Sequence, residues 1–181
     1  MIRQFVFIFF IIGSSLIFQK SYVPVDQGSK VHFVIRNFGI NTGGDFTGLK
    51  GSINFDPKAL SSSKLDVSIA ATTVDTDNSS RDKSLRSDEY FDVKKYPEIN
   101  LASTKISLAN NSEGAYIFTG NITIHGVKRG ITFPFNAELV NGDYVFTGNF
   151  DLNRLDFGVG EKSAVLSNKV SISLKVIAKQ K

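Results

Sequence analysis

Few residues in this sequence could carry out chemistry. The 181 residues include two histidines, His32 and His125, and no cysteine. The absence of cysteine excludes disulfide scaffolds, thiolate zinc sites, iron–sulfur clusters and cysteine nucleophiles. A metal site would need both histidines to converge with carboxylates, and their spacing gives no such signal. We therefore predict no metal.

Each histidine also has a simpler interpretation than catalysis. His125 directly precedes Gly126 at a predicted strand end, where a general base and a turn-stabilising hydrogen bond are the alternatives. His32 alternates with Val34 and Arg36, so we expect it to face solvent or a partner. The sequence contains no G-x-S-x-G, P-loop or H-E-x-x-H motif, and no serine lies in an activating motif. It therefore predicts no catalytic residue, no cofactor and no enzyme.

Composition narrows the function classes further. The 21 Lys+Arg and 17 Asp+Glu residues give a net charge of +4, without the clustered basic residues of a nucleic-acid surface. The hydrophobic fraction of 41% is too high for a disordered chain. The length suits a single domain with one sizeable core.

The N-terminus has the pattern of an export signal. Arg3 is followed by a mostly apolar stretch from Phe5 to Phe18, shorter than the ~20 residues that span a bilayer. We predict a signal peptide over residues 1–20, with an uncertain cleavage site, and an uncleaved anchor as the alternative. Either way, the domain of residues 21–181 would be periplasmic or secreted.

The rest of the chain alternates between apolar and polar residues, which is typical of half-buried strands. Asn141-Gly142 predicts a type I′ hairpin turn, and residues 126–130 predict a second tight connection. About eight segments alternate, within residues 31–36, 49–55, 65–71, 99–108, 116–125, 131–139, 144–152 and 170–178. The fold class is therefore all-β, with eight antiparallel strands in a closed barrel or a sandwich.

Helical signals are sparse. Asp56 and Pro57 could begin a single turn that runs to Leu60. Residues 79–93 form the one longer candidate, a short helical insert that Ser79 or Ser80 could cap and that we expect to pack on or across the sheet.

The predicted inward faces are rich in Phe and Ile, with glycines among them. An eight-stranded barrel can hold one small ligand, and an apolar lumen favours an apolar ligand. Gly120 and Gly148 are expected to leave room beside the rings. The alternative is that these side chains simply fill the core. The candidate cavity-lining residues are Phe118, Gly120, Ile122, Phe133, Phe135, Phe146, Gly148 and Phe150.

Several short motifs follow one another in order along the chain. They are Ser29-Lys30-Val31-His32-Phe33, Gly44-Asp45-Phe46-Thr47-Gly48, Gly51-Ser52-Ile53-Asn54-Phe55-Asp56, residues 78–85, Glu89-Tyr90-Phe91-Asp92 with Tyr96-Pro97, residues 120–127, and Asn153-Arg154-Leu155-Asp156-Phe157-Gly158. This ordered set resembles the YceI-like family of bacterial secreted proteins, over about residues 21 to 179. The resemblance implies a lipocalin-like barrel that holds a long polyisoprenoid chain, such as a quinone tail, in an elongated apolar cavity.

One position departs from the family pattern. The family often has Arg-Asp-x-His-Leu in the insert, where this chain has Ser84 in the fourth position. Arg81 and Asp82 could contact a ligand head group at the barrel mouth, or could cap the helix and pin it to a strand. Arg154 and Asp156 are expected to form an ion pair at a strand end, with Phe157 as an aromatic plug.

Three functions follow as hypotheses. The first is an extracytoplasmic protein that binds an isoprenoid lipid and acts as a carrier or buffer. The second is an enzyme acting on a small apolar substrate in the same cavity, and the third is a structural domain that binds nothing. A homodimer is an open alternative for the assembly.

Overall fold

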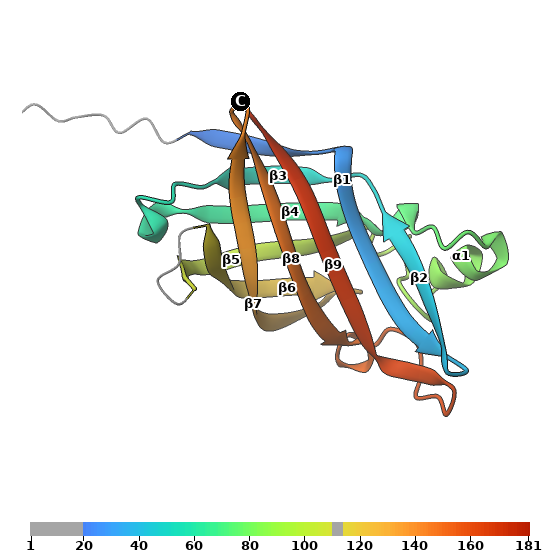
Figure 1. Ribbon diagram of the computed structural model, residues 1–181. Coiled ribbons are helices and arrows are strands. Elements are labelled where there is room, and N and C mark those ends of the chain that lie inside the picture. The colour runs from blue at the N-terminus through green and yellow to red at the C-terminus, as the bar shows by residue number, and fades with distance from the viewer. Residues whose placement is uncertain (1–19, 110–113) are drawn as a thin grey trace, which may run out of the picture.

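The computed structural model describes residues 20–109 and 114–181, which form a closed antiparallel barrel (Figure 1). The predicted export signal lies almost entirely in residues 1–19, outside the described residues. The nine strands described are β1 (Ser21–Asn37), β2 (Ile40–Phe46), β3 (Lys50–Asn54), β4 (Lys64–Ala70), β5 (Glu98–Leu108), β6 (Ala115–Ile124), β7 (Val127–Val140), β8 (Asp143–Asn153) and β9 (Leu166–Gln180). Strands β3 to β9 pair in chain order, and β9 closes on β1.

The nine strands occupy eight positions around the barrel, which confirms the predicted fold class. β2 pairs with the C-terminal half of β1, from Val31 to Asn37, whereas β3 pairs with its first two residues. Both lie along the same edge of β1, so β2 and β3 act as one barrel strand that is interrupted at residues 47–49. The sequence analysis missed β2.

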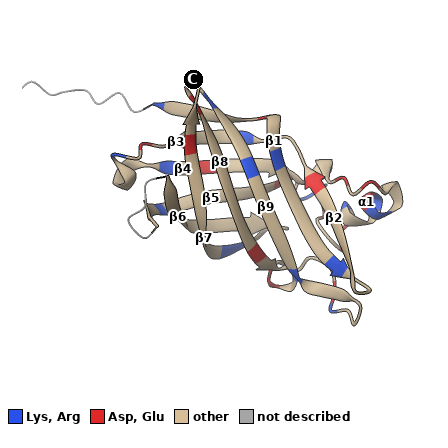
Figure 2. Cartoon of the chain, viewed as in Figure 1, with Lys and Arg blue, Asp and Glu red and all other residues tan. Residues whose placement is uncertain are grey.

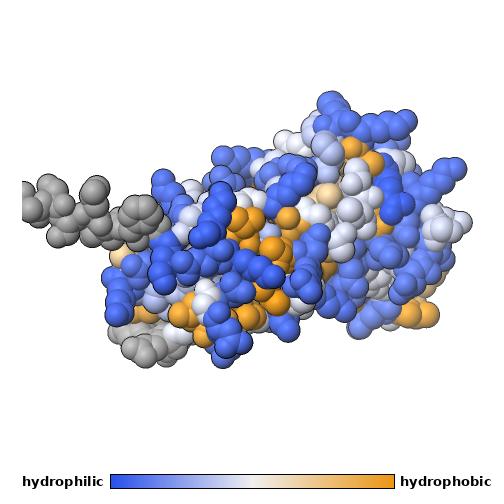
Figure 3. Space-filling view, turned by 90° about the horizontal axis from the view of Figure 1, so that it is seen from above, coloured by the Kyte–Doolittle hydropathy of each residue, from blue (hydrophilic) through white to orange (hydrophobic). Residues whose placement is uncertain are grey.

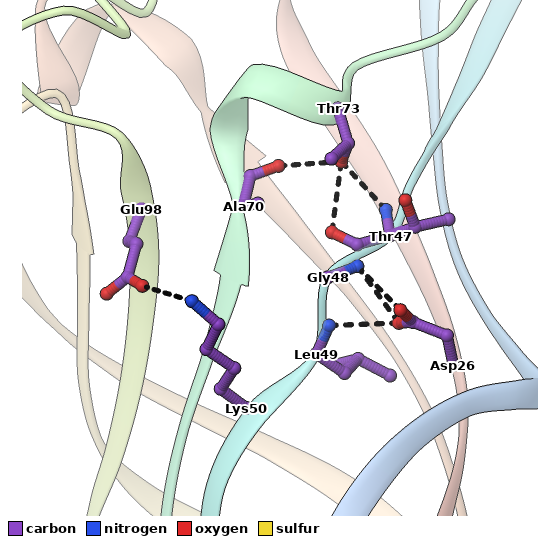
Figure 4. A network of polar contacts seen from close by, with 8 residues as sticks. All are labelled: Asp26, Thr47, Gly48, Leu49, Lys50, Ala70, Thr73 and Glu98. Atoms are coloured by element: carbon purple, nitrogen blue, oxygen red, sulfur yellow. Dashed lines mark hydrogen bonds and ion pairs between the residues drawn. The ribbon is translucent and has the colours of Figure 1, made fainter.

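The interruption faces a bend in β1 (Figure 4). The β1–β9 register shifts between Val25 and Lys30, and the Ser29 hydroxyl accepts a hydrogen bond of 2.8 Å from the Ile177 amide in place of a backbone carbonyl. Across the bend, the Asp26 carboxylate accepts hydrogen bonds from the amides of Gly48 and Leu49 at 2.9–3.0 Å. These side chains satisfy backbone groups that lose their ladder partners at the corner.

The two hairpin turns that the sequence predicted need left-handed backbone, and the residues there supply it. Asn141 and Gly142 have φ values of 53° and 91°, which confirms the predicted turn. The second connection is tighter than predicted: only His125 and Gly126 form it, with φ values of 51° and 74°, and Val127 already begins β7.

The helical insert is present but shorter than predicted. α1 spans Ser79–Leu85, and turns continue to residue 95. The helix is capped by Asn78, whose side chain accepts the Arg81 amide, and not by Ser79 or Ser80. The other predicted turn begins where expected: the Asp56 side chain accepts the Lys58 amide at 2.8 Å, and its carbonyl accepts the Ala59 amide at 3.0 Å. A 3₁₀ turn over Leu60–Ser62 follows it.

Side chains alternate between the lumen and the outside along most strands. β6 alternates strictly between buried and half-buried residues. On the face in Figure 3, the outward side chains are mostly hydrophilic, with an apolar patch near the middle. Among the described residues, no helix has the length and apolar character needed to cross a membrane.

Candidate functional site

The barrel contains a cavity in two adjoining chambers, with volumes of about 270 Å³ and 110 Å³. Hydrophobic side chains dominate both linings. The residues common to both chambers are Phe33, Phe46, Ile99, Ile124, Leu152 and Ile172. The shared wall makes the two chambers one elongated apolar space along the barrel.

Packed aromatic rings fill the half of the barrel that lies away from the larger chamber. Phe55 lies at their centre, with ring centroids 5.1–5.5 Å from those of Tyr116, Tyr144 and Phe146. Tyr22 packs edge-on against Tyr144 at 5.0 Å. We call this cluster, which also includes Phe118, Phe133 and Phe135, the aromatic plug. The plug gives the cavity a blind end.

The structure divides the predicted cavity-lining residues between these two regions. Ile122 and Phe150 line the smaller chamber. Phe118, Phe133, Phe135 and Phe146 instead belong to the plug, outside both chamber linings. Phe150 lies at the boundary, because its ring also contacts Phe133 at 4.4 Å.

Gly120 and Gly148 do not open free space beside the rings, contrary to expectation. A Cβ atom at Gly120 would lie 2.8 Å from the Phe118 ring and 2.2 Å from the Ala102 carbonyl oxygen. A Cβ at Gly148 would lie 3.3 Å from the Cβ of Phe135. The neighbouring side chains have taken the room that each missing side chain leaves, so both glycines permit dense packing.

The larger chamber opens toward the insert and the connection between β8 and β9. From the insert, Ser84, Leu85 and Phe91 contribute to the lining, and Phe91 packs edge-on against Phe46 at 5.7 Å. Ser84, the position that departs from the family pattern, therefore lies at the cavity. Its hydroxyl donates to the Ser80 carbonyl at 3.2 Å, within the helix.

Arg81 and Asp82, both predicted as mouth residues, have different positions. Arg81 lines the larger chamber and donates through Nε and Nη2 to the hydroxyl and carbonyl of Thr76, at 2.8 and 2.6 Å. Asp82 is buried and is outside both chamber linings. Its carboxylate accepts the Thr76 amide at 2.9 Å and the Thr76 hydroxyl at 2.6 Å. The pair pins the helix to residue 76, and Arg81 alone also faces the chamber.

Replacing Asp82 with alanine should lower the free energy of unfolding by about 3 kcal/mol, because the buried amide and hydroxyl of Thr76 would lose their acceptor. Asp88→Ala, at an exposed carboxylate of the same insert, is the matched control and should change it by less than about 0.5 kcal/mol. Urea unfolding followed by circular dichroism measures both, and equal effects would contradict the pinning role.

Arg154 does not form the ion pair that the sequence predicted. It is 5% exposed, lines the larger chamber and forms no ion pair with Asp156. Its guanidinium donates instead to the carbonyls of Val159, Glu161 and Ser167 at 2.7–3.0 Å. Desolvation by burial holds the pKa of Arg154 below its ordinary value. Phe157, which was predicted to plug the strand end, is buried and lines the larger chamber, away from the cluster around Phe55.

His125 takes a structural position, whereas His32 also lines the smaller chamber. His125 Nδ1 lies 3.3 Å from the Phe157 carbonyl oxygen, and its ring packs edge-on against Tyr96 at 5.2 Å. His32 Nδ1 lies 2.7 Å from the carboxylate of Asp45 on β2. Within residues 20–109 and 114–181, no cluster of three or more potential metal ligands forms.

Sequence comparison finds similar proteins in several bacteria. The chain is 34% identical to a UPF0312 protein of Yersinia enterocolitica over 124 residues, 68% of this chain and 63% of that protein. It is 33% identical to Protein YceI of Salmonella agona over 130 residues, 71% of this chain and 66% of the relative. The matched region thus spans slightly less than two thirds of each relative's length.

Solved structures share the barrel. Burkholderia cenocepacia BcnA superposes with a TM-score of 0.78 at 23% identity, over 84% of this chain and 98% of that one. A polyisoprenoid binding domain from Saccharophagus degradans gives 0.70 at 15% identity, over 88% and 98%. Both likenesses show the fold alone. The YceI-like domain model matches residues 22–178, so the chain belongs to the YceI-like family.

Proposed function

We propose that this protein binds a long apolar lipid chain, of the polyisoprenoid class, inside the barrel and serves as its carrier or buffer outside the cytoplasm. The observation that carries the proposal is the blind apolar cavity, whose two chambers share one wall. A flexible prenyl chain suits such a space, because it gains dispersion contacts along its length and removes about 0.8 kcal/mol of unfavourable hydration per buried methylene group.

Two further observations support binding in preference to catalysis. The larger chamber is lined by Arg, Asn, Ser, Thr and Tyr among its polar residues, and by no carboxylate or imidazole. The smaller chamber has one imidazole in its lining, that of His32, and no carboxylate. A solved structure with the same fold is named as a polyisoprenoid binding domain. The export signal predicted for residues 1–20 supports a location outside the cytoplasm.

Affinity for prenyl alcohols should rise with chain length and then reach a plateau. Each added isoprene unit buries more apolar surface until the chain meets the aromatic plug, beyond which further units stay in water. Isothermal titration calorimetry with prenyl alcohols of two to eight isoprene units measures the series. Affinity that is independent of chain length, or absent throughout, would contradict the proposal.

Native mass spectrometry of the protein purified from its own cell envelope provides a second measurement. A retained mass that corresponds to a prenyl lipid supports the carrier role. Turnover of a small apolar substrate by a lipid-free protein would support the enzyme alternative.

A further inference from the structure

Three exposed apolar side chains lie together at the open end of the barrel. Phe38, in the turn that joins β1 to β2, is 73% exposed, and Ile40, which begins β2, is 71% exposed. Val165, in the connection between β8 and β9, is 40% exposed, and its carbonyl accepts the Phe38 amide at 2.9 Å. The hairpin and the connection therefore lie side by side, at the lower right of Figure 1. We call these three residues the apolar tip.

Phe38 is an unfavourable residue for its turn. Asn37 pairs with Ile40 across the turn. Phe38 and Gly39 therefore form a two-residue turn in which both have positive φ, 49° and 77°. Such turns favour Asn or Asp at the first position, and the β7–β8 hairpin has Asn141 there, with a φ of 53°. A bulky ring that combines positive φ with exposure to solvent contributes little to the fold, which points to a role at the surface.

The apolar tip extends the lining of the larger chamber past its rim. Because side chains alternate along a strand, Ile40 lies on the lumen side of β2, the side of Thr42, which lines the chamber. Asn37 and Leu166, which adjoin the apolar tip along the chain, line the chamber as well. An exposed apolar surface that surrounds the opening of an apolar cavity fits an apolar phase lying against that opening, as a lipid bilayer provides.

The charge beside the apolar tip favours an anionic surface. Arg36 is exposed and lines an open groove of about 380 Å³ between the hairpin and the connection, and Lys162 of the connection is exposed too. Glu161 offsets one of these two charges, so the hairpin turn and the connection together keep an excess of one positive charge. Figure 2 shows a basic segment where β1 ends, beside the hairpin turn. The nearby Asp151 carboxylate is already paired with Lys169, at 2.8 Å.

We propose that the apolar tip inserts into the interface of a lipid bilayer that contains anionic lipids, with Arg36 and Lys162 against their head groups. The opening of the larger chamber then faces the membrane. This inference goes beyond the proposed function, because it names the surface on which the barrel docks, and it rests in part on the lipid-binding role. A lipid that leaves the bilayer at this point enters the chamber without crossing water.

Co-sedimentation with vesicles tests the proposal, using phosphatidylcholine alone and an equal mixture with phosphatidylglycerol. The wild-type protein should bind the mixed vesicles more tightly, and added salt should reduce the difference. Phe38→Asn should lower the partition coefficient for mixed vesicles at least about tenfold, because the ring no longer enters the interface. The same change should not lower the free energy of unfolding in urea, because Asn suits the left-handed turn.

Leu139→Thr is the matched control for the loss of an exposed apolar side chain. Leu139 is 57% exposed and pairs with Tyr144 of the aromatic plug, so it lies at the other end of the barrel. Its replacement should leave vesicle binding unchanged. Arg36→Gln should weaken binding to mixed vesicles about fivefold and leave binding to phosphatidylcholine within about twofold, because only the electrostatic attraction is lost.

The outcomes separate this inference from the proposed function. Absence of vesicle binding by the wild-type protein, or equal binding by Phe38→Asn, overturns the docking surface. A wild-type dimer that Phe38→Asn converts to a monomer in sedimentation velocity, without vesicle binding, assigns the apolar tip to a second copy and also overturns it. Phe38→Asn should bind prenyl alcohols in solution as the wild-type protein does. Vesicle binding by a protein that takes up no prenyl alcohol contradicts the proposed function and upholds the docking surface.

Discussion

Replacing Ile172 with tryptophan is expected to weaken binding of a long prenyl alcohol at least about tenfold while the barrel stays folded. Ile172 lies on β9, lines both chambers and is only half-buried, because its side chain faces the cavity. The larger indole would occupy space that the lipid chain needs. Excluding two methylene groups costs about 1.6 kcal/mol, which already exceeds the 1.4 kcal/mol of a tenfold change.

Calorimetric titration measures the affinity, and thermal unfolding followed by circular dichroism confirms the fold. Ile40→Trp is the matched control, since Ile40 is 71% exposed and lies outside both chambers. The control should bind the alcohol as the wild-type protein does. Undiminished binding by a folded Ile172→Trp variant would show that the ligand does not occupy this cavity.

Phe55→Ala is expected to lower the free energy of unfolding by about 3–5 kcal/mol. Phe55 is 3% exposed and packs against four other rings of the aromatic plug, so its removal leaves a cavity inside the plug. Urea denaturation gives the free energy directly. Phe38→Ala makes the same chemical change at a ring that is 73% exposed and should alter stability by less than about 0.5 kcal/mol. A small effect at Phe55 would mean that the plug is loosely packed.

Alternation in the sequence predicted the barrel strands well because each has one face toward the lumen. It missed β2, where two glycines make the strand look like a loop. Gly44 pairs with Phe33, and a Cβ there would lie 2.7 Å from both the Phe33 ring and the Asp75 carbonyl oxygen. Only glycine lets the Phe33 ring lie this close to the β2 backbone. Glycine is depleted in strands, so its presence weakens the sequence pattern that would have predicted β2.

The position of the cavity along the barrel was harder to predict than the inward face. Phe118 and Ile122 lie on the same face of β6, yet Phe118 belongs to the plug and Ile122 lines a chamber. The difference depends on the side chains that meet from other strands at each level, which requires the register. For example, the pattern alone suggests that Gly148→Phe would fill the lumen. In the structure the new ring would instead overpack the plug against Phe133 and Phe135.

Arg154 shows a similar limit at the level of one side chain. Its neighbour Asp156 suggested an ion pair, but Arg154 begins a 3₁₀ turn over Arg154–Phe157, and its guanidinium reaches carbonyls that follow this turn. A hydrogen bond from a side chain to backbone carbonyls later in the chain cannot be recognised from a sequence pattern, because every residue has a carbonyl. A buried arginine without an acidic partner is therefore recognised only once the chain is folded.

Neighbouring strands of the barrel are not joined by equal numbers of backbone hydrogen bonds around its circumference. β1 and β9 pair from Tyr22 to Asn37, with two register shifts, whereas β2 is joined to the segment that follows β4 by a single bridge. This bridge links Asp45 and Asp75 through two hydrogen bonds of 2.8 and 3.1 Å. This seam borders the chamber that contains Phe46 and lies away from the plug. Widening the open half at this seam would therefore break few backbone hydrogen bonds.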